Sequence, residues 1–130
     1  MAHILITEDD DAVRAFVRRA LEIDGHVVTV AQDGGEALEI LERDAGFDLL
    51  LSDIMMPVMD GIGLALNVAR DHPELPILLM TGFADQRERA HNLEAIVHDV
   101  VPKPFTLAEI RRAVRDALAA GPAARRLKTG

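Results

Sequence analysis

Five polar side chains stand directly after short apolar runs of the sequence. Glu8 and Asp9 follow one run, and Asp53, Thr81 and Lys103 each end or follow another. Because the carboxyl ends of parallel strands meet at one edge of a sheet, we expect these side chains to converge in one pocket. Three carboxylates, a hydroxyl and an ammonium group suit a magnesium ion and a phosphoryl group.

The acidic cluster that begins at Glu8 has two interpretations. Asp10 and Asp11 are explained by the start of a helix, where acidic side chains cap the helix and meet the positive end of its dipole. Glu8 and Asp9 still belong to the end of the strand, and beside Asp53 their like charges would repel one another. A hard cation with oxygen ligands, such as Mg²⁺, would relieve that repulsion. The spacing alone leaves a metal site and simple capping both open.

The other polar groups each have a structural and a chemical interpretation. Asp53 caps a turn after its strand, or it is a carboxylate nucleophile that forms an aspartyl phosphate. Thr81 ends a strand before a turn, or it donates its hydroxyl to a phosphoryl oxygen. Lys103 is a surface lysine, or it neutralises phosphoryl charge as a point cation at the sheet edge. The chemical interpretations together predict phosphoryl transfer.

The composition restricts the class of protein. The chain has 130 residues, enough for one domain, and its net charge of -8 disfavours nucleic acid as a partner. It has no cysteine, which excludes disulfides and thiolate metal sites and fits a cytoplasmic protein. No apolar run approaches the roughly 18 residues of a membrane span, so we expect no membrane association. Dinucleotide-binding, P-loop and zincin motifs are absent as well.

Strand and helix patterns alternate along the chain. The predicted strands cover residues 3–7, 26–31, 47–53, 76–81 and 96–101. The predicted helices have their apolar stripes within residues 13–21, 37–41, 62–69, 85–93 and 106–119. This is the (βα)5 pattern of an α/β fold with a doubly wound parallel sheet. We expect one domain over residues 1–120, followed by a short, flexible basic tail over residues 121–130.

Nearly the whole chain resembles the receiver domain of two-component response regulators, the CheY-like family. The resemblance rests on an acidic strand end, a phosphoacceptor loop, a switch hydroxyl and a lysine, found in that order at residues 4–10, 53–61, 81–82 and 103–105. It implies a flavodoxin-like strand order of 2-1-3-4-5. It also implies a cis proline after Lys103.

The resemblance implies roles for the polar side chains. Glu8, Asp9 and the backbone carbonyl of Met55 would bind Mg²⁺ together with Asp53. Asp53 would accept phosphate from a sensor histidine kinase or a histidine phosphotransferase, with Thr81 and Lys103 completing the reactive set. The protein would then be no enzyme beyond self-catalysed phosphotransfer and autodephosphorylation.

Two positions depart from the family pattern. Val100 stands where the family commonly has an aromatic residue three positions before its lysine, so a coupled ring rotation is not expected. Met55 and Phe83 flank the phosphate position, and their apolar side chains should obstruct an attacking water. We therefore expect a long-lived phosphorylated form.

The predicted output is a phosphorylation-dependent protein contact through the helix at residues 85–93, the strand at 96–101 and the helix at 106–119. Exposed arginines would serve that contact, namely Arg87, Arg89, Arg111 and Arg115. The segment 81–84 and Val100 further resemble CpdR-type single-domain regulators, which are adaptors linked to an ATP-dependent protease in cell-cycle control.

Two other functions fit parts of the sequence. A relay receiver would pass its phosphate to a histidine phosphotransferase and make no output contact. An Asp-nucleophile, Mg²⁺-dependent phosphatase would use the same chemistry, but it usually needs a second Asp two residues after the nucleophile, where Met55 stands.

Overall fold

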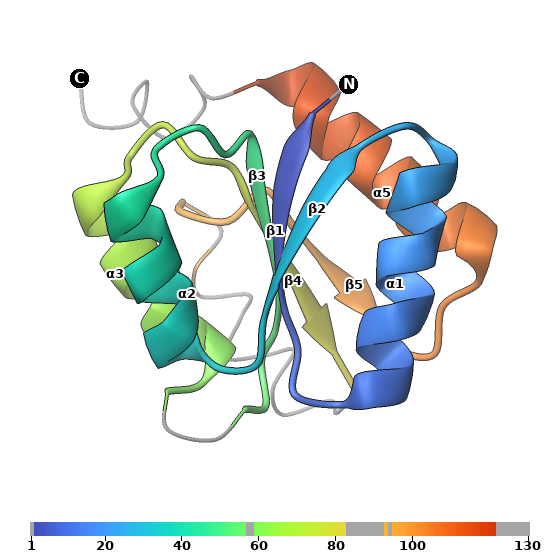
Figure 1. Ribbon diagram of the computed structural model, residues 1–130, viewed down its shortest axis with the longest axis horizontal. Coiled ribbons are helices and arrows are strands. Elements are labelled where there is room, and N and C mark those ends of the chain that lie inside the picture. The colour runs from blue at the N-terminus through green and yellow to red at the C-terminus, as the bar shows by residue number, and fades with distance from the viewer. Residues whose placement is uncertain (1, 57–58, 83–92, 94, 122–130) are drawn as a thin grey trace.

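A five-stranded parallel sheet forms the centre of the computed structural model, in the order β2-β1-β3-β4-β5 (Figure 1). The structure describes residues 2–56, 59–82, 93 and 95–121. The strands are β1 (His3–Thr7), β2 (Val27–Ala31), β3 (Leu49–Asp53), β4 (Ile77–Thr81) and β5 (Asp99–Pro102). The predicted α/β class and the strand order 2-1-3-4-5 are therefore confirmed.

The helices begin where capping side chains stand. They are α1 (Asp11–Ile23), α2 (Gly34–Arg43), α3 (Gly61–Asp71) and α5 (Leu107–Ala120). Their N-terminal caps are Asp10, Asp33, Asp60 and Thr106. A capping box begins α5, since the Glu109 N–H donates to Thr106 Oγ1 at 3.0 Å and the Thr106 N–H donates to Glu109 Oε1 at 2.8 Å. Among these helices none combines the length and apolar character that crossing a bilayer requires.

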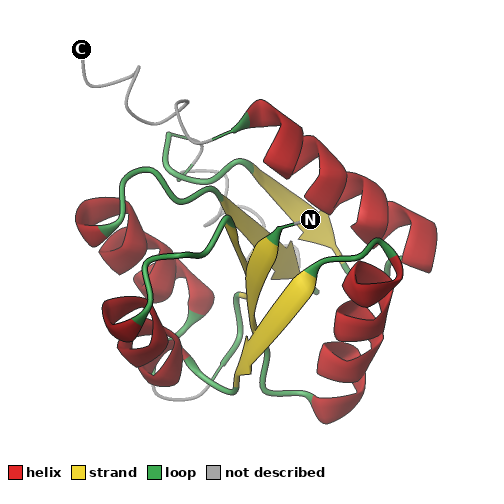
Figure 2. Cartoon of the chain, turned by 45° about the horizontal axis from the view of Figure 1, so that its top comes forward, coloured by secondary structure: helices red, strands yellow, loops and turns green. Residues whose placement is uncertain are grey.

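Helices cover both faces of the sheet, with α2 and α3 on one face and α1 and α5 on the other (Figures 1 and 2). Successive residues of a strand point to opposite faces, so each inner strand supplies both apolar layers. In β1, Leu5 joins the layer under α2 and α3, while Ile4 and Ile6 join the layer under α1 and α5. This double burial explains the near-continuous apolar runs of the inner strands.

Two predicted strands start two or three residues later than expected, and two others start one residue later. The run 47–53 is a strand only from Leu49. Just before it, the Asp48 N–H donates to the His3 carbonyl at 2.8 Å, and the Asp48 carboxylate, not a backbone carbonyl, accepts from the His3 N–H at 2.8 Å. The run 96–101 becomes β5 only at Asp99. The N–H groups of residues 96 and 97 donate to the Leu93 carbonyl at 2.8 and 3.0 Å, which makes a turn. The predicted helix at 85–93 and the tail after residue 121 lie outside the described residues, apart from Leu93.

Candidate metal and phosphoryl site

The register of the sheet brings the predicted polar groups to one edge. Thr7 of β1 pairs with Ser52 of β3, and Thr81 of β4 pairs with Pro102 of β5. Glu8 and Asp9 follow Thr7, Asp53 follows Ser52, and Lys103 follows Pro102. These residues therefore meet at the carboxyl edge of the sheet, which is the lower edge in Figure 1. The expected convergence at the carboxyl ends of the strands is present.

Lys103 joins the two buried carboxylates of this edge. Its Nζ lies 3.0 Å from Glu8 Oε1 and 3.0 Å from Asp53 Oδ1. Glu8 is fully buried and Asp53 is 6% exposed, so both contacts are shielded from water. The backbone N–H of Lys103 also donates to the Thr81 carbonyl at 2.7 Å, which fixes the Lys103 backbone beside the end of β4. Lys103 is thus a fixed member of the site and not a solvated surface lysine.

The three acidic side chains form a group that fits a hard cation. One carboxylate oxygen each from Glu8, Asp9 and Asp53 lies within 4.8 Å of the others. Glu8 Oε2 is buried and has no hydrogen-bond partner among the described residues. A buried carboxylate oxygen without a partner is unfavourable, and a ligated cation would satisfy it. Asp9 is exposed, so the site opens to solvent, where a Mg²⁺ ion could keep several of its waters.

The pKa values of the buried groups reflect this crowding. Burial, followed by the negative charge of Asp53, raises the pKa of Glu8 to about 7, although the hydrogen bond from Lys103 works in the other direction. Burial alone would lower the pKa of Lys103, but its hydrogen bonds to Asp53 and Glu8 outweigh burial and raise that pKa. The lysine therefore stays charged. Glu8 ionises only at a higher pH than an ordinary glutamate, because the nearby positive charge does not offset burial and the charge of Asp53.

A tight loop holds the backbone of Asp53 in place. The Gly61 N–H donates to the Ile54 carbonyl at 2.7 Å, and a Cβ added at Gly61 would lie only 2.1 Å from the Asp53 carbonyl oxygen. Ser52 Oγ donates to that same Asp53 carbonyl at 2.9 Å. Only glycine allows the start of α3 to approach β3 this closely.

Sequence reasoning missed three residues of this support. Arg14 Nη1 donates to the Glu8 carbonyl at 2.8 Å, and nothing in its sequence context distinguished it from other helical arginines. Ser52 and Gly61 were also passed over as positioning residues. The signal that could have found Gly61 is its place at the end of the phosphoacceptor loop, directly before the next predicted helix.

The flanking positions are only partly described. Thr81 is fully buried at the end of β4. The Met55 side chain is 55% exposed in the loop after β3, and Phe83 lies outside the described residues. Val100 is half-buried against the apolar layer under α2 and α3. The bond between Lys103 and Pro104 is cis, as the resemblance implied.

Comparisons with known proteins agree with the geometry. Residues 4–115 match the response regulator receiver domain family. The response regulator MprA of Mycobacterium leprae is 41% identical over 112 residues, which cover 86% of this chain and 49% of the relative. MprA of Mycobacterium ulcerans is 40% identical over 112 residues, 86% of this chain and 48% of that protein. The chain spans about half the length of these curated relatives.

Solved structures agree as well. A CheY-like receiver domain protein from Methanospirillum hungatei has a TM-score of 0.84 at 28% identity, covering 92% of this chain and 95% of its own. A putative response regulator from Chloroflexus aurantiacus has a TM-score of 0.83 at 32% identity, covering 91% and 98%. TrrA from Thermotoga maritima, solved in complex with Mg²⁺-BeF, has a TM-score of 0.82 at 25% identity, covering 90% and 99%.

The strand order, the acidic group beside a lysine and the matched span of residues all lead to one conclusion. This chain belongs to the response regulator receiver domain family of two-component systems, with the CheY-like, flavodoxin-like fold.

Proposed function

We propose that this receiver domain, over residues 1–120, is phosphorylated on Asp53 in a Mg²⁺-dependent reaction. The donor would be a sensor histidine kinase or a histidine phosphotransferase, the donor classes of its family. The observation that carries the proposal is the pair of 3.0 Å contacts from Lys103 to Glu8 and Asp53. These contacts support the proposal because a half-buried cation lies against Asp53, the carboxylate at the end of β3.

The chain's own groups account for the transfer. An Asp53 oxygen attacks phosphorus, a P–O bond forms, and the P–N bond to the donor histidine breaks with its electron pair going to the imidazole. Lys103, already beside Asp53, would neutralise charge on the transferred oxygens. Glu8, Asp9, Asp53 and the Met55 carbonyl would hold Mg²⁺, which when bound supplies positive charge against the repulsion between carboxylates and phosphate.

Thr81 and Lys103 connect the site to the rest of the fold. Thr81 would donate its hydroxyl to a phosphoryl oxygen, and Lys103 would shift its contacts from Glu8 toward the phosphate. Thr81 ends β4 and Lys103 follows β5, so binding of phosphate would change contacts at the ends of both strands. We propose that the signal leaves through β5, α5 and the segment 85–93, as a displacement of backbone because Val100 provides no aromatic ring.

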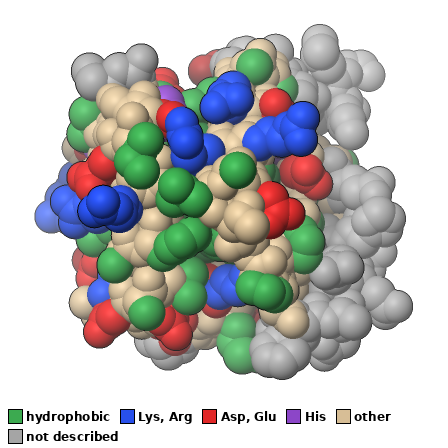
Figure 3. All heavy atoms as spheres, turned by 90° about the vertical axis from the view of Figure 1, so that its right-hand side faces the viewer, with side chains coloured by type: hydrophobic (Ala, Val, Ile, Leu, Met, Phe, Trp, Pro, Cys, Tyr) green, Lys and Arg blue, Asp and Glu red, His purple; other side chains and the backbone are tan. Residues whose placement is uncertain are grey.

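The partner would be a protein that contacts the α5 side. Figure 3 shows the face over α1 and α5, where arginine and lysine side chains lie among apolar and acidic ones. Arg115 is exposed on α5, but Arg111 is already bonded to Asp24, which follows α1, with Nη2 2.5 Å from Oδ1. The expectation that Arg111 is exposed was wrong, because Arg111 is half-buried against Asp24. Arg87 and Arg89 lie outside the described residues.

The finer assignments stay predictions. A CpdR-type adaptor role and a cytoplasmic location rest on the sequence features given above. The relay alternative would be favoured if phosphate moved from Asp53 to a histidine phosphotransferase and no phosphorylation-dependent protein partner were captured. The phosphatase alternative is disfavoured because the apolar Met55 stands at the position where its second acid is needed.

The reaction can be tested with acetyl phosphate and mass spectrometry of the intact protein. We expect the addition of one phosphoryl group with Mg²⁺, its loss in EDTA and its loss in Asp53→Ala. Asp116→Ala is the matched control, since Asp116 is an exposed aspartate on α5. Modification that persists in Asp53→Ala, or that EDTA leaves unchanged, would contradict the proposal.

A further inference from the structure

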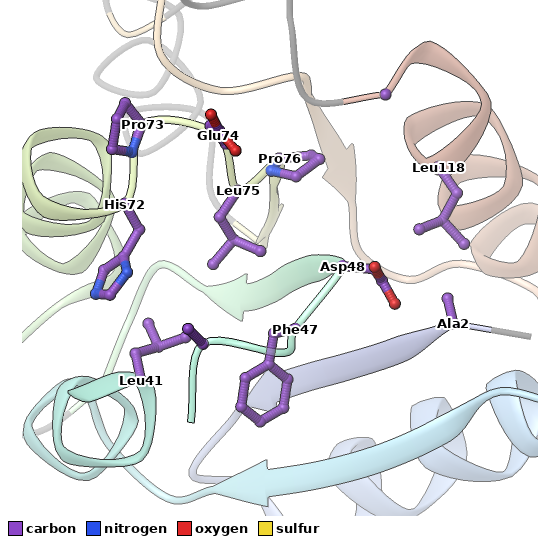
Figure 4. Close-up of a pocket in the computed structure, with 12 residues that line it drawn as sticks. Ala2, Leu41, Phe47, Asp48, His72, Pro73, Glu74, Leu75, Pro76 and Leu118 are labelled. Carbon is purple, nitrogen blue, oxygen red and sulfur yellow. The ribbon is translucent and has the colours of Figure 1, made fainter. Parts of the chain in front are cut away.

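A cavity of about 690 Å³ lies at the amino edge of the sheet, opposite the phosphoryl site (Figure 4). It opens where β1, β3 and β4 begin. Apolar side chains form much of its lining, among them Leu41, Phe47, Leu75 and Leu118. Two exposed carboxylates, those of Asp48 and Glu74, lie beside them. The cavity therefore offers an apolar surface and negative charge together.

The ends of the helices add to the negative character of this cavity. Residues at or near the C-terminal ends of α2, α3 and α5 line it, including Leu41, His72 and Gly121. The last carbonyl groups of a helix carry partial negative charge and favour nearby cations. The last turn of α5 contains no basic residue of its own. A ligand that is both apolar and cationic would complement the lining.

The chain carries such a segment directly after the cavity. Gly121 lines the cavity, and residues 122–130 follow it, outside the described part of the chain. Their sequence places one large apolar residue, Leu127, between Arg126 and Lys128, with Arg125 one position earlier. Leu127 stands six positions after Gly121, and an extended chain of six residue steps spans up to about 20 Å. The segment can therefore turn back from the rim into the cavity.

We propose that residues 122–130 dock in the amino-edge cavity of their own chain. Leu127 would contact Leu41, Leu75 and Leu118. The three basic side chains would face Asp48, Glu74 and the helix ends. The flexible tail expected from composition would then be the undocked form, and burial of Leu127 together with charge complementarity would favour the docked form. This proposal is independent of phosphorylation at Asp53.

A spin label on the segment would test the docking. The chain has no cysteine, so Thr129→Cys provides a single position for a nitroxide label and keeps Leu127 in place. We expect loss of most of the backbone amide NMR intensity at Leu41, Leu75 and Leu118, and none at the carboxyl edge. The loss should not change with protein concentration.

Three variants separate the contributions. Leu127→Asp should restore the intensities, and Glu74→Lys should restore them in part. Glu39→Lys changes the net charge equally at an exposed position of α2 outside the cavity lining, and it should have no effect. Phosphorylation of Asp53 should proceed in all of them.

The proposal is overturned if the cavity amides keep their intensity. Intensity loss that grows with protein concentration would also overturn it, because the occupant would then be a second copy of the chain. The same holds if Leu127→Asp leaves the losses unchanged, or if Glu39→Lys and Glu74→Lys act equally.

Discussion

The two edges of the sheet use the same topology for opposite purposes. The carboxyl edge buries the carboxyl group of Glu8 beside a half-buried Lys103, and at Gly61 it packs backbone against backbone. The amino edge leaves an apolar cavity of about 690 Å³ and keeps its charges at the surface. The difference follows from direction, because parallel strands and returning helices place strand ends and helix N-termini at one edge and helix C-termini at the other. Tight packing at one edge therefore does not require tight packing at the other.

The largest expected effect tests the close packing of the carboxyl edge. Gly61→Ala would place a Cβ 2.1 Å from the Asp53 carbonyl oxygen, so the loop after β3 must move. We expect a loss of about 3 kcal/mol or more in the free energy of unfolding, together with slower phosphorylation. A Cβ added by Gly63→Ala on the same helix would meet the flexible Met59 Cγ at 3.3 Å and Asp60 Oδ1 at an ordinary 3.5 Å, so this variant should change stability by less than about 1 kcal/mol. Equal losses for the two variants in urea unfolding would refute the packing argument.

The second prediction concerns the charge buried at the same edge. The folded protein holds the pKa of Glu8 near 7, above its ordinary value of 4.5, so folding favours the protonated form. The stability from this group is complete below pH 4.5 and is lost as the pH rises through about 7. In EDTA at pH 8, Glu8→Gln should therefore stabilise the protein by up to roughly 3 kcal/mol, and the gain should shrink toward pH 5.

Unfolding of both forms across this pH range is the measurement. Glu39→Gln, at an exposed position on α2, is the control and should show no such trend. A gain from Glu8→Gln that does not vary with pH would show that Glu8 carries no raised pKa.

A third, smaller effect concerns water at the carboxyl edge and rests on the proposed phosphorylation. Met55 cannot hydrogen-bond an incoming water, so Met55→Asn should speed loss of the phosphoryl group by up to about tenfold, through better positioning of the nucleophile. Leu66→Asn is a suitable control, because Leu66 is 52% exposed on α3 against 55% for Met55. Decay of the phosphorylated protein, followed by mass spectrometry, would show the difference. If Met55→Asn decays no faster than Leu66→Asn, the shielding argument fails.

The smallest expected effect lies among the partly exposed charges. Arg111 donates to Asp24, which follows α1, and the hydrogen bonds from Arg111 lower the pKa of Asp24. A carboxyl group whose pKa is lowered on folding stabilises the protein at pH values above its pKa in the unfolded state. This stabilisation is lost as the pH falls through its pKa in the folded state. Asp24→Asn should therefore reduce the melting temperature slightly at pH 7, with the difference disappearing in acid. Water screens this pair, so the effect should be well below that of Glu8→Gln. The control Asp116→Asn should leave the melting temperature unchanged. If Asp24→Asn changed stability as much as Glu8→Gln does, the distinction between the two edges would be lost.

The sequence was sufficient for much of the fold, because buried parallel strands and capped helices leave local signals. The apolar runs that end at Asp53 and Thr81 predicted β3 and β4, and the apolar stripe within residues 106–119 predicted α5. The strand at residues 96–101 was placed too early because apolar character alone does not distinguish a buried turn from a strand. Local pattern says nothing about which backbone groups find a ladder partner.

The site was predictable in its residue types but not in its contacts. Strand ends indicated that Glu8, Asp53 and Lys103 would meet, since the topology alone brings them together. The bridging position of Lys103, the pairing of Arg111 with Asp24 and the cavity at the amino edge depend on side-chain packing between distant elements. No periodicity records such packing.

The bridge made by Lys103 also has a consequence for folding. Glu8 and Lys103 are 95 positions apart in the sequence, so their contact forms only after nearly the whole domain has been synthesised. Before β5 joins the sheet edge, Glu8 and Asp53 would be buried side by side with no counter-charge from the protein, which disfavours a compact nascent chain. Arrival of the last strand supplies the ammonium group and closes contacts of high sequence separation at the same moment. A growing chain should thus show no partly built site, and its acquisition should coincide with completion of the sheet.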